Sequence, residues 1–348
     1  MARRNLWWSE MTGPSRFINA AVELLQKERS VLFGMPKTVP FEDDFFNILQ
    51  EELKENFTES GVVFLDGNIE DVSGYFMERY CRAGVQASFR PKPGYSAARF
   101  LAENENASLH GNIFVVIPES TAVLSAFENF VSDYSKHLRK DIDPALFVIT
   151  AKESWLKANS AAGIKQLHYA DYATTFDAYT YCALRASEIK EPDAVKAYLA
   201  ELASTVTKGN VEQAEVALSV YREFLNSPQL FFEKRGVDIP YDDDRLECVI
   251  WEAQLKCLFP LLERFRRYLV EKYTTVIQRN LPLRNPLGDD YTEASDVELG
   301  AMLYMIKCRM FRIEYDDFQE LKVCASARND LAHVTVLPYE TIRRITSY

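Results

Sequence analysis

The sequence predicts an α/β domain followed by an all-α region, and three observations lead to this fold class. Short apolar runs alternate with longer amphipathic segments over the first 175 residues, the strand signal disappears after about residue 172, and successive helical segments fill the C-terminal third. Alternating strands and helices are typical of a largely parallel sheet with helices on both faces, a three-layer domain. Successive helices without strands between them are typical of a bundle.

Five apolar runs are the expected strands of the N-terminal domain. They lie among Gly, Pro or Asp residues, and the middle three are rich in β-branched side chains. The expected strands are 30–35 (SVLFGM), 61–67 (GVVFLDG), 112–118 (NIFVVIP), 145–150 (ALFVIT) and 164–171 (IKQLHYAD). The expected helices between them are Arg16–Lys27, Asp43–Glu55, Ala122–Leu138 and Trp155–Asn159.

Beyond residue 172 the pattern is helical. The expected helices are 172–187, 192–204, 211–226, 245–278, 296–311, one from 316 and a short last one from 338. The stretch 236–244 (GVDIPYDDD) is the best linker candidate because it combines Gly, Pro and Asp. We therefore divide the chain into an α/β domain (1–175), a helical linker region (176–240) and a helical bundle (241–348).

Composition and charge restrict the function. A chain of 348 residues with 47% hydrophobic and 26% charged residues is ordinary for a globular protein. The formal charge of -11 opposes a broad nucleic-acid-binding face, because polyanion affinity comes from lysines and arginines. Residues 241–348 hold 15 Lys and Arg against 18 Asp and Glu, a net charge of -3, and the first 240 residues hold the remaining -8. We expect any RNA contact to be local, and the C-terminal third is the more favourable place.

The cysteines and the apolar runs indicate a cytoplasmic protein. The six cysteines form no C-x-x-C pair, which predicts reduced core residues and neither a zinc site nor a disulfide framework. No apolar run approaches the length of about 18 residues that a membrane span needs. The start MARRNLWWSEM lacks the apolar stretch of a secretory leader. We expect no membrane segment and no bound metal.

The turn after the first expected strand, 34–44 (GMPKTVPFEDD), is where a parallel-sheet domain would bind a phosphate. It contains Gly34, Lys37 and Thr38 but lacks the second glycine of G-x-x-x-x-G-K-[ST], and two prolines remove backbone N–H donors. The order of elements resembles the P-loop NTPase or signalling-ATPase class (STAND- or AAA-like) with degenerate motifs. This resemblance implies a regulatory or sensing domain without a working P-loop and without a cofactor.

Isolated titratable residues of this domain favour ordinary structural roles. Glu119 follows the third expected strand, where a Walker B acid would lie, but a lone carboxylate there is more often a helix N-terminal charge. His110, His137 and His168 lack metal-ligand spacing, and we interpret each as a surface histidine or one with its hydrogen bonds satisfied.

Residues 327–333, ARNDLAH, concentrate polar chemistry near the end of the chain. Arg328 and His333 form an R-x4-H pattern, and Asn329 follows the arginine. On an ideal helix Arg328 and His333 lie about 140° apart and do not share a face, whereas Asn329 and His333 are i,i+4 neighbours. We expect Arg328 and His333 to act together only if the helix ends between them or if two copies face each other.

With its flanking helices, this motif resembles the HEPN superfamily, whose ribonuclease members carry R-x4-6-H late in a four-helix bundle. The resemblance covers roughly residues 245–348 and includes LFPLLERFRRYLVEKY, an NLP...G loop, DVELGAMLYMI and LPYETIRRI. It implies a metal-independent endoribonuclease with Arg328, His333 and Asn329 in the catalytic site. It also implies a homodimer through the C-terminal bundle, because in the family two protomers or domains commonly bring their motifs together.

The residue types suit RNA cleavage. A histidine that titrates near neutrality can move a proton, and a guanidinium can stabilise charge on a phosphate. Arg264 and Arg267 are candidate phosphate-binding residues, and a solvated, ion-paired face is their alternative interpretation.

Proteins built this way resemble toxin-like effectors of bacterial stress or antiphage defence. The implied partners are a single-stranded RNA or tRNA substrate and a protein trigger at the N-terminal domain. In the alternative, ARNDLAH only stabilises a bundle end, and the chain is a non-catalytic interaction or dimerisation subunit of a larger complex.

Overall fold

The computed structural model describes residues 6–284 and 290–347. The chain forms two compact units, Met1–Asp177 and Ala178–Tyr348, and each is described by itself. None of the helices within the described ranges combines the length and the apolar character needed to cross a bilayer.

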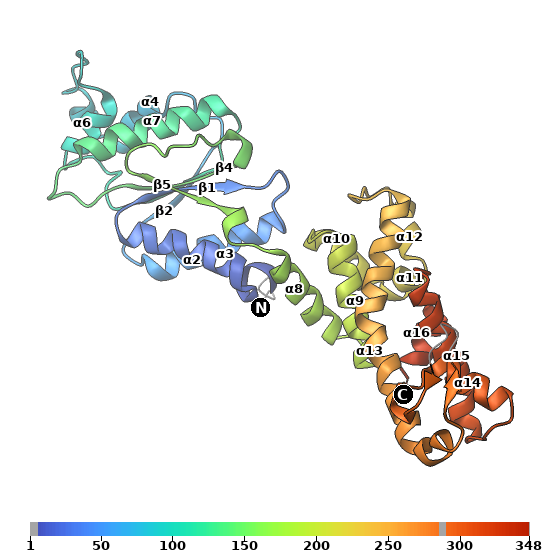
Figure 1. Ribbon diagram of the computed structural model, residues 1–348. Coiled ribbons are helices and arrows are strands. Elements are labelled where there is room, and N and C mark those ends of the chain that lie inside the picture. The colour runs from blue at the N-terminus through green and yellow to red at the C-terminus, as the bar shows by residue number, and fades with distance from the viewer. Residues whose placement is uncertain (1–5, 285–289, 348) are drawn as a thin grey trace. The chain divides into compact units, whose positions relative to one another are not determined.

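The N-terminal unit is built on a five-stranded sheet, all of whose paired strands are parallel, in the order β2-β3-β4-β1-β5 (Figure 1). The strands are β1 (Ser30–Met35), β2 (Val62–Leu65), β3 (Ile113–Val116), β4 (Leu146–Lys152) and β5 (Ile164–His168). Each of the five expected runs overlaps one strand, so the predicted parallel-sheet domain is confirmed. β1 lies between β4 and β5 and is buried at every position, whereas the edge strand β2 is partly exposed.

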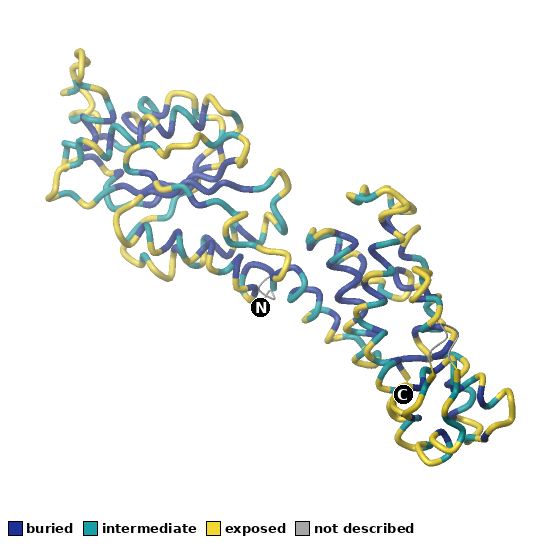
Figure 2. Tube along the Cα trace, in the orientation of Figure 1, coloured by how far each residue is buried: buried dark blue, intermediate teal, exposed yellow. Residues whose placement is uncertain are grey.

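Helices cover both faces of this sheet, and Figure 2 shows the buried strands between them. One face carries α2 (Thr12–Gln26) and α3 (Glu42–Asn56), and the other carries α4 (Val72–Tyr80), α6 (Ala97–Glu103) and α7 (Thr121–His137). Shorter elements are α1 (Leu6–Glu10), α5 (Ala83–Gln86), η1 (Glu153–Trp155) and η2 (Tyr169–Asp171). Because side chains alternate across a strand, aromatic rings fill both faces. Phe33 packs on Phe17 and Phe45 with ring centroids 4.7 and 5.6 Å apart, and Phe114 packs on Phe76 at 4.9 Å.

The connection from β4 to β5 differs from the prediction. The expected helix Trp155–Asn159 is absent, and the chain forms only the 3-10 turn η1 there. Trp155 and Leu156 pack against the core that α7 shares with the sheet. The packing of these two side chains against the core therefore determines the conformation of this segment, and the local helical pattern does not.

The C-terminal unit is helical except for a two-stranded hairpin among its described residues. Its elements are α8 (Thr175–Ser187, which begins before the boundary), α9 (Asp193–Val206), α10 (Val211–Ser219), α11 (Tyr221–Asn226), α12 (Pro228–Phe231), η3 (Glu233–Arg235), α13 (Asp243–Gln278), β6 (Leu283–Arg284), β7 (Asp290–Tyr291), η4 (Ala294–Asp296), α14 (Leu299–Lys307), α15 (Tyr315–Ala332) and α16 (Tyr339–Ile345). The long helix α13 is the centre of the unit, because α9, α15 and α16 all pack against it.

A buried glutamine joins three parts of this unit. Gln254 of α13 is 1% exposed, and its amide donates to the hydroxyl of Tyr198 on α9 at 3.2 Å. The same side chain accepts from the N–H of Leu337 at 2.7 Å and donates to the carbonyl of Leu337 at 3.0 Å. Residues of the segment 176–240, which the sequence separates as a linker region, thus share a core with the helices that follow.

Candidate functional site at the end of helix α15

The ARNDLAH motif occupies about the last two turns of α15 and its C-cap. The helix ends at Ala332, and the N–H of His333 still donates to the carbonyls of Asn329 and Asp330 at 3.0 and 3.1 Å. His333 is the C-cap residue directly after the helix and still continues its hydrogen-bond pattern, so the divergence of about 140° expected for an ideal helix applies to Arg328 and His333. Asn329 and His333 are both exposed.

A tight turn follows the histidine. The N–H of Val334 donates to the carbonyl of Leu331 at 3.3 Å, and the N–H of Thr335 donates to that of Asp330 at 2.9 Å. This hydrogen-bond pair is a Schellman motif, which requires a left-handed residue, usually glycine. Val334 holds that position with φ of 59°, an unfavourable conformation for a β-branched residue. The turn leaves His333 at the exposed tip of the helix.

Helix α13 fixes this turn from the core side. The indole N–H of Trp251 donates to the carbonyl of Leu331 at 2.8 Å, before the turn. Gln254 lies three residues after Trp251 on α13. Its side chain bonds both the N–H and the carbonyl of Leu337, which follows the tight turn. His333 therefore projects from a backbone that is held on both sides, as a site residue requires.

Arg328 has a carboxylate partner that the sequence did not indicate. Its Nη2 lies 3.0 Å from Oε2 of Glu298, and the two side chains are 34% and 47% exposed. Tyr291 lies close to this pair: burial and then the Glu298 charge raise the pKa of Tyr291, while Arg328 lowers it. Glu298 comes from the loop before α14, so no local sequence signal pairs it with Arg328. An incoming phosphate would compete with this carboxylate for the guanidinium.

The structure brings together only part of the predicted site. Arg328, Asn329 and His333 share one helix end, but within the described residues no hydrogen bond or ion pair joins Arg328 to His333. Arg264 and Arg267 are exposed on α13, and α13 runs antiparallel to α15. Arg264 lies 13 residues beyond Trp251, a rise of about 20 Å along the helix. The two α13 arginines are therefore not beside His333 in one chain.

Arg264 instead lines a separate groove between α13 and α15. This groove has a volume of about 440 Å³, and Tyr268, Asp317 and Cys324 also line it. Arg266, between the two candidates, pairs with Glu263 at 2.8 Å and donates to the Ser295 carbonyl at 2.7 Å, so it holds the loop before α14.

The edge of the sheet where a P-loop would bind phosphate is filled by a side-chain carboxylate. Glu153 follows β4, and its Oε1 lies 2.6 Å from Nδ1 of His168 at the end of β5. Between them, β1 carries Gly34, where an added Cβ would lie 2.2 Å from Oε2 of Glu153. The glycine thus allows close approach of an internal carboxylate, in the place where a phosphate would need space.

The helix after this loop is also unfavourable to anions. The N-terminus of a helix attracts phosphate through its free N–H groups and its dipole. Here the first turn of α3 already carries Glu42, Asp43 and Asp44. Three carboxylates would repel a triphosphate, which agrees with the missing glycine and the two prolines of the sequence.

His110, His137 and Glu119 have ordinary structural surroundings in this unit. Both ring nitrogens of His110 are bonded, to the Tyr134 hydroxyl at 2.9 Å and to a backbone carbonyl at 2.8 Å, and burial lowers the pKa of His110. His137 lies 3.2 Å from the carboxylate of Asp133. Glu119 is exposed and immediately precedes the N-cap of α7. Residues 6–284 and 290–347 contain no group of three His, Cys, Asp or Glu side chains that could hold a metal ion.

Comparisons with known proteins give no family assignment. No family model matches the chain, and no curated protein sequence matches it. Among solved structures, the match to RuvB of Thermotoga maritima covers 97% of this chain and 89% of the RuvB chain, with 14% sequence identity and a TM-score of 0.37. The match to Cdc6p of Pyrobaculum aerophilum covers 100% of this chain and 95% of the Cdc6p chain, with 13% sequence identity and a TM-score of 0.33. The match to the DNA clamp loader delta protein of Bacillus subtilis covers 90% of this chain and 94% of that protein's chain, with 11% sequence identity and a TM-score of 0.25. Because these TM-scores are low, the fold rests on the strand order and register described above.

Proposed function

We propose that this chain is a metal-independent endoribonuclease of the HEPN type, with Arg328, Asn329 and His333 as its site residues. The observation that carries the proposal is the exposed His333 at a helix end that Trp251 and the Leu337 contacts hold in place. Arg328 and Asn329, within the two preceding turns, supply the other groups that RNA cleavage needs.

The proposed reaction is attack of the ribose 2'-OH on the adjacent phosphorus. The attacking oxygen loses its proton to a base, the P–O5' bond breaks, and an acid gives a proton to the leaving 5'-oxygen. The products are a 2',3'-cyclic phosphate and a 5'-hydroxyl. His333 serves as the acid or base, Arg328 stabilises the charge on the phosphate, and Asn329 orients the histidine or binds the phosphate.

The geometry favours a homodimer for this chemistry. One imidazole cannot act as acid and base at once, and Arg328 faces Glu298 while His333 lies at the helix tip. A second chain, docked through the C-terminal bundle, would supply the second histidine and complete a shared groove. Substrate phosphate would then displace Glu298 from Arg328.

In this proposal the N-terminal unit is a regulatory or sensing domain that resembles a degenerate P-loop domain. The parallel sheet, the carboxylate over Gly34 and the acidic start of α3 support a role without nucleotide hydrolysis. The whole chain would act in the cytoplasm as a toxin-like effector of stress or antiphage defence, restrained until a protein trigger binds this unit. Its substrate would be single-stranded RNA or tRNA.

The test is cleavage by the full-length protein. Labelled single-stranded RNA and tRNA are incubated with it in the presence of EDTA, and the product ends are analysed. We expect cyclic-phosphate ends, and a loss of at least about 100-fold in rate for His333→Ala, the scale of general acid–base catalysis. The matched control is His168→Ala, a carboxylate-paired histidine of the other unit, which should retain the wild-type rate.

Two results would contradict this proposal. Cleavage that persists in His333→Ala would remove the site assignment. A wild-type protein that dimerises but cleaves neither substrate, with or without a cellular trigger, would favour the non-catalytic interaction subunit, for which the Arg328–Glu298 ion pair is a stabilising contact.

A further inference from the structure

One segment of the N-terminal unit has a charge opposite to that of the whole protein. From Arg79 to Ala102 the chain carries five cationic residues and no acidic one, although its formal charge is -11. These cations are Arg79, Arg82, Arg90, Lys92 and Arg99. The net charge of -8 over the first 240 residues conceals this basic segment. A net charge calculated over a short sliding window would have revealed it.

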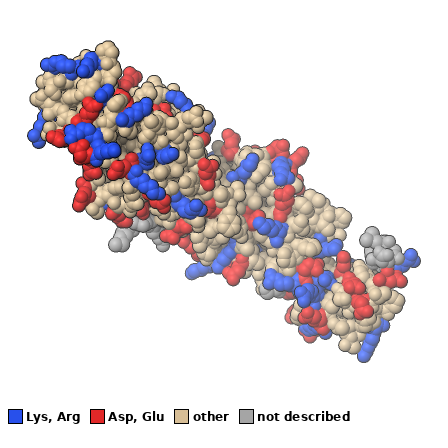
Figure 3. Space-filling model, turned by 60° about the vertical axis from the view of Figure 1, so that its left-hand side comes forward, with Lys and Arg blue, Asp and Glu red and all other residues tan. Residues whose placement is uncertain are grey.

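Most of these cations are not neutralised within the protein. Arg82, Arg90 and Lys92 are exposed, and none of the three forms an ion pair with a described residue. The Arg90 guanidinium donates only to backbone carbonyls, at 2.6 and 2.9 Å. Arg99 alone has a carboxylate partner, Glu103 at 2.7 Å. Figure 3 shows Lys and Arg side chains, with Asp and Glu side chains beside them, at the end of the unit where α4 and α6 lie.

Aromatic rings lie among these cations. The guanidinium of Arg79 is 5.0 Å from the ring centroid of Tyr75, and the cationic groups of Arg99 and Lys92 are 5.3 and 5.4 Å from that of Tyr95. Both tyrosines are partly exposed. Cations interleaved with stacking platforms are characteristic of surfaces that bind single-stranded nucleic acids.

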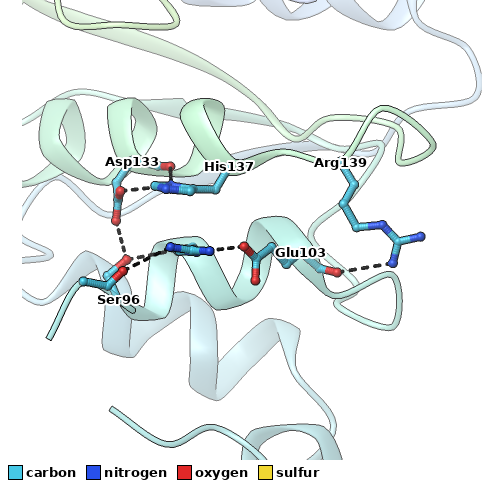
Figure 4. Close-up of polar contacts among 7 residues, drawn as sticks. Ser96, Glu103, Asp133, His137 and Arg139 are labelled. Atoms are coloured by element: carbon cyan, nitrogen blue, oxygen red, sulfur yellow. Dashed lines mark hydrogen bonds and ion pairs between the residues drawn. The ribbon is translucent and has the colours of Figure 1, made fainter. Parts of the chain in front are cut away.

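The segment is held to the domain at both ends. Figure 4 shows Ser96 at the start of α6 bonded to Asp133 of α7, which also pairs with His137. The Ser96 hydroxyl also accepts the N–H of Arg99 at 3.0 Å and so caps α6. At the other end, the carbonyl of Tyr80 accepts from the N–H of Ser108 at 2.8 Å. The cations therefore project from an anchored surface.

We propose that this surface, made of the Arg79–Arg99 segment and the adjacent Tyr75, binds single-stranded nucleic acid through its phosphates, with bases stacking at Tyr75 and Tyr95. Four of its five cations are arginines, whose planar fork matches phosphate oxygens. Its largest apolar side chain, Phe89, packs on Phe100 with centroids 5.1 Å apart, and no large apolar residue of the segment is exposed for insertion into a lipid bilayer. The inference uses no residue of the α15 site and stands independently of the proposed nuclease activity.

The test is fluorescence anisotropy of the full-length protein with a labelled 20-nucleotide single-stranded RNA and the same sequence as DNA, at several salt concentrations. The triple variant Arg82→Gln, Arg90→Gln, Lys92→Gln should weaken binding at low salt about tenfold or more. It should also reduce the slope of log affinity against log salt by about 2, since each lost phosphate contact contributes about 0.7 for a single strand. The matched control is Lys27→Gln, Arg29→Gln, Lys54→Gln, which removes the same charge from exposed positions of the same unit.

The outcomes separate the possible partners. Tighter RNA than DNA binding, with both lost in the triple variant, supports the proposal and identifies RNA as the ligand, and the reverse order identifies DNA. Equal weakening by the two triple variants would overturn it, because the effect would then be one of general charge. Binding only to vesicles that contain anionic lipid, with none to either oligonucleotide, would also overturn it.

Discussion

At the scale of single residues, the conformation of Val334 decides how the candidate site is presented. A valine with φ of 59° occupies a position that glycine normally fills, and its side chain is 54% exposed, so little packing compensates for the strain. Strained residues are frequent at functional sites. Here the strained turn places His333 at the tip of α15 and directs the chain back to α13.

We expect Val334→Gly to stabilise the C-terminal unit by about 0.5–1 kcal/mol. A left-handed conformation costs a β-branched residue about 1–2 kcal/mol, and the extra unfolded-state entropy of glycine offsets part of the gain. Urea unfolding followed by circular dichroism measures the change. The control is Val336→Gly, whose φ is not positive and which should destabilise the same unit. Destabilisation by Val334→Gly would show that the turn is not strained in solution.

At the scale of elements, helix α13 positions the site because one buried side chain links it to two other segments. Gln254 satisfies both backbone groups of Leu337 and contacts Tyr198 of α9. Local periodicity predicted α13 and α15 within a few residues, but this junction depends on residues 83 positions apart. The sequence therefore predicted the ARNDLAH motif but not Trp251 and Gln254, the residues of α13 that hold it in place.

Gln254→Leu should destabilise the C-terminal unit by about 2–3 kcal/mol. The substitution keeps the volume but leaves the buried N–H and C=O of Leu337 without partners, and each unsatisfied group costs about 1–3 kcal/mol. Chemical denaturation again provides the measurement. Gln229→Leu, at an exposed position of the same unit, should change stability by less than about 0.5 kcal/mol. Equal effects of the two substitutions would argue against the junction.

At the scale of the whole molecule, paired carboxylates make stability depend on pH. In the N-terminal unit, burial raises the pKa of Asp177, but hydrogen bonds from Thr174 and the N–H of Gly13 leave it below its ordinary value. In the C-terminal unit, burial likewise raises the pKa of Glu215, and hydrogen bonds from Arg185 and Tyr181 lower it below its ordinary value of 4.5. A depressed pKa means that the folded state favours the charged form.

Both units should therefore lose stability as the pH falls below about 4.5. A carboxylate with a depressed folded pKa stabilises the fold above its unfolded pKa, and this contribution disappears as the pH falls through the folded pKa. Thermal unfolding between pH 7 and 3 tests this. Glu215→Gln should lower stability at pH 7 by about 2 kcal/mol, and the difference from wild type should shrink in acid. Glu233→Gln, at an exposed position, is the control. A difference that is constant with pH would refute the assignment to Glu215.

The sequence by itself determined the local features of this protein. Short apolar runs among Gly, Pro or Asp residues predicted where the five strands lie, and helical periodicity predicted the long helix α13. The R-x4-H pattern of ARNDLAH is likewise visible in the sequence alone. These features depend on neighbours along the chain, so a pattern is sufficient to find them. The ribonuclease function read from the HEPN resemblance stays a prediction.

The tertiary structure decided what depends on residues far apart in sequence. Three features join segments that no sequence periodicity connects. They are the position of β3 and β4 between β2 and β1, the close approach of the Glu153 carboxylate to Gly34, and the ion pair of Arg328 with Glu298. The same is true of the turn at Val334, where α13 contacts outweigh the preference of valine for negative φ. Long-range packing energies overrule local preferences at these places, and for that reason only the folded chain shows them.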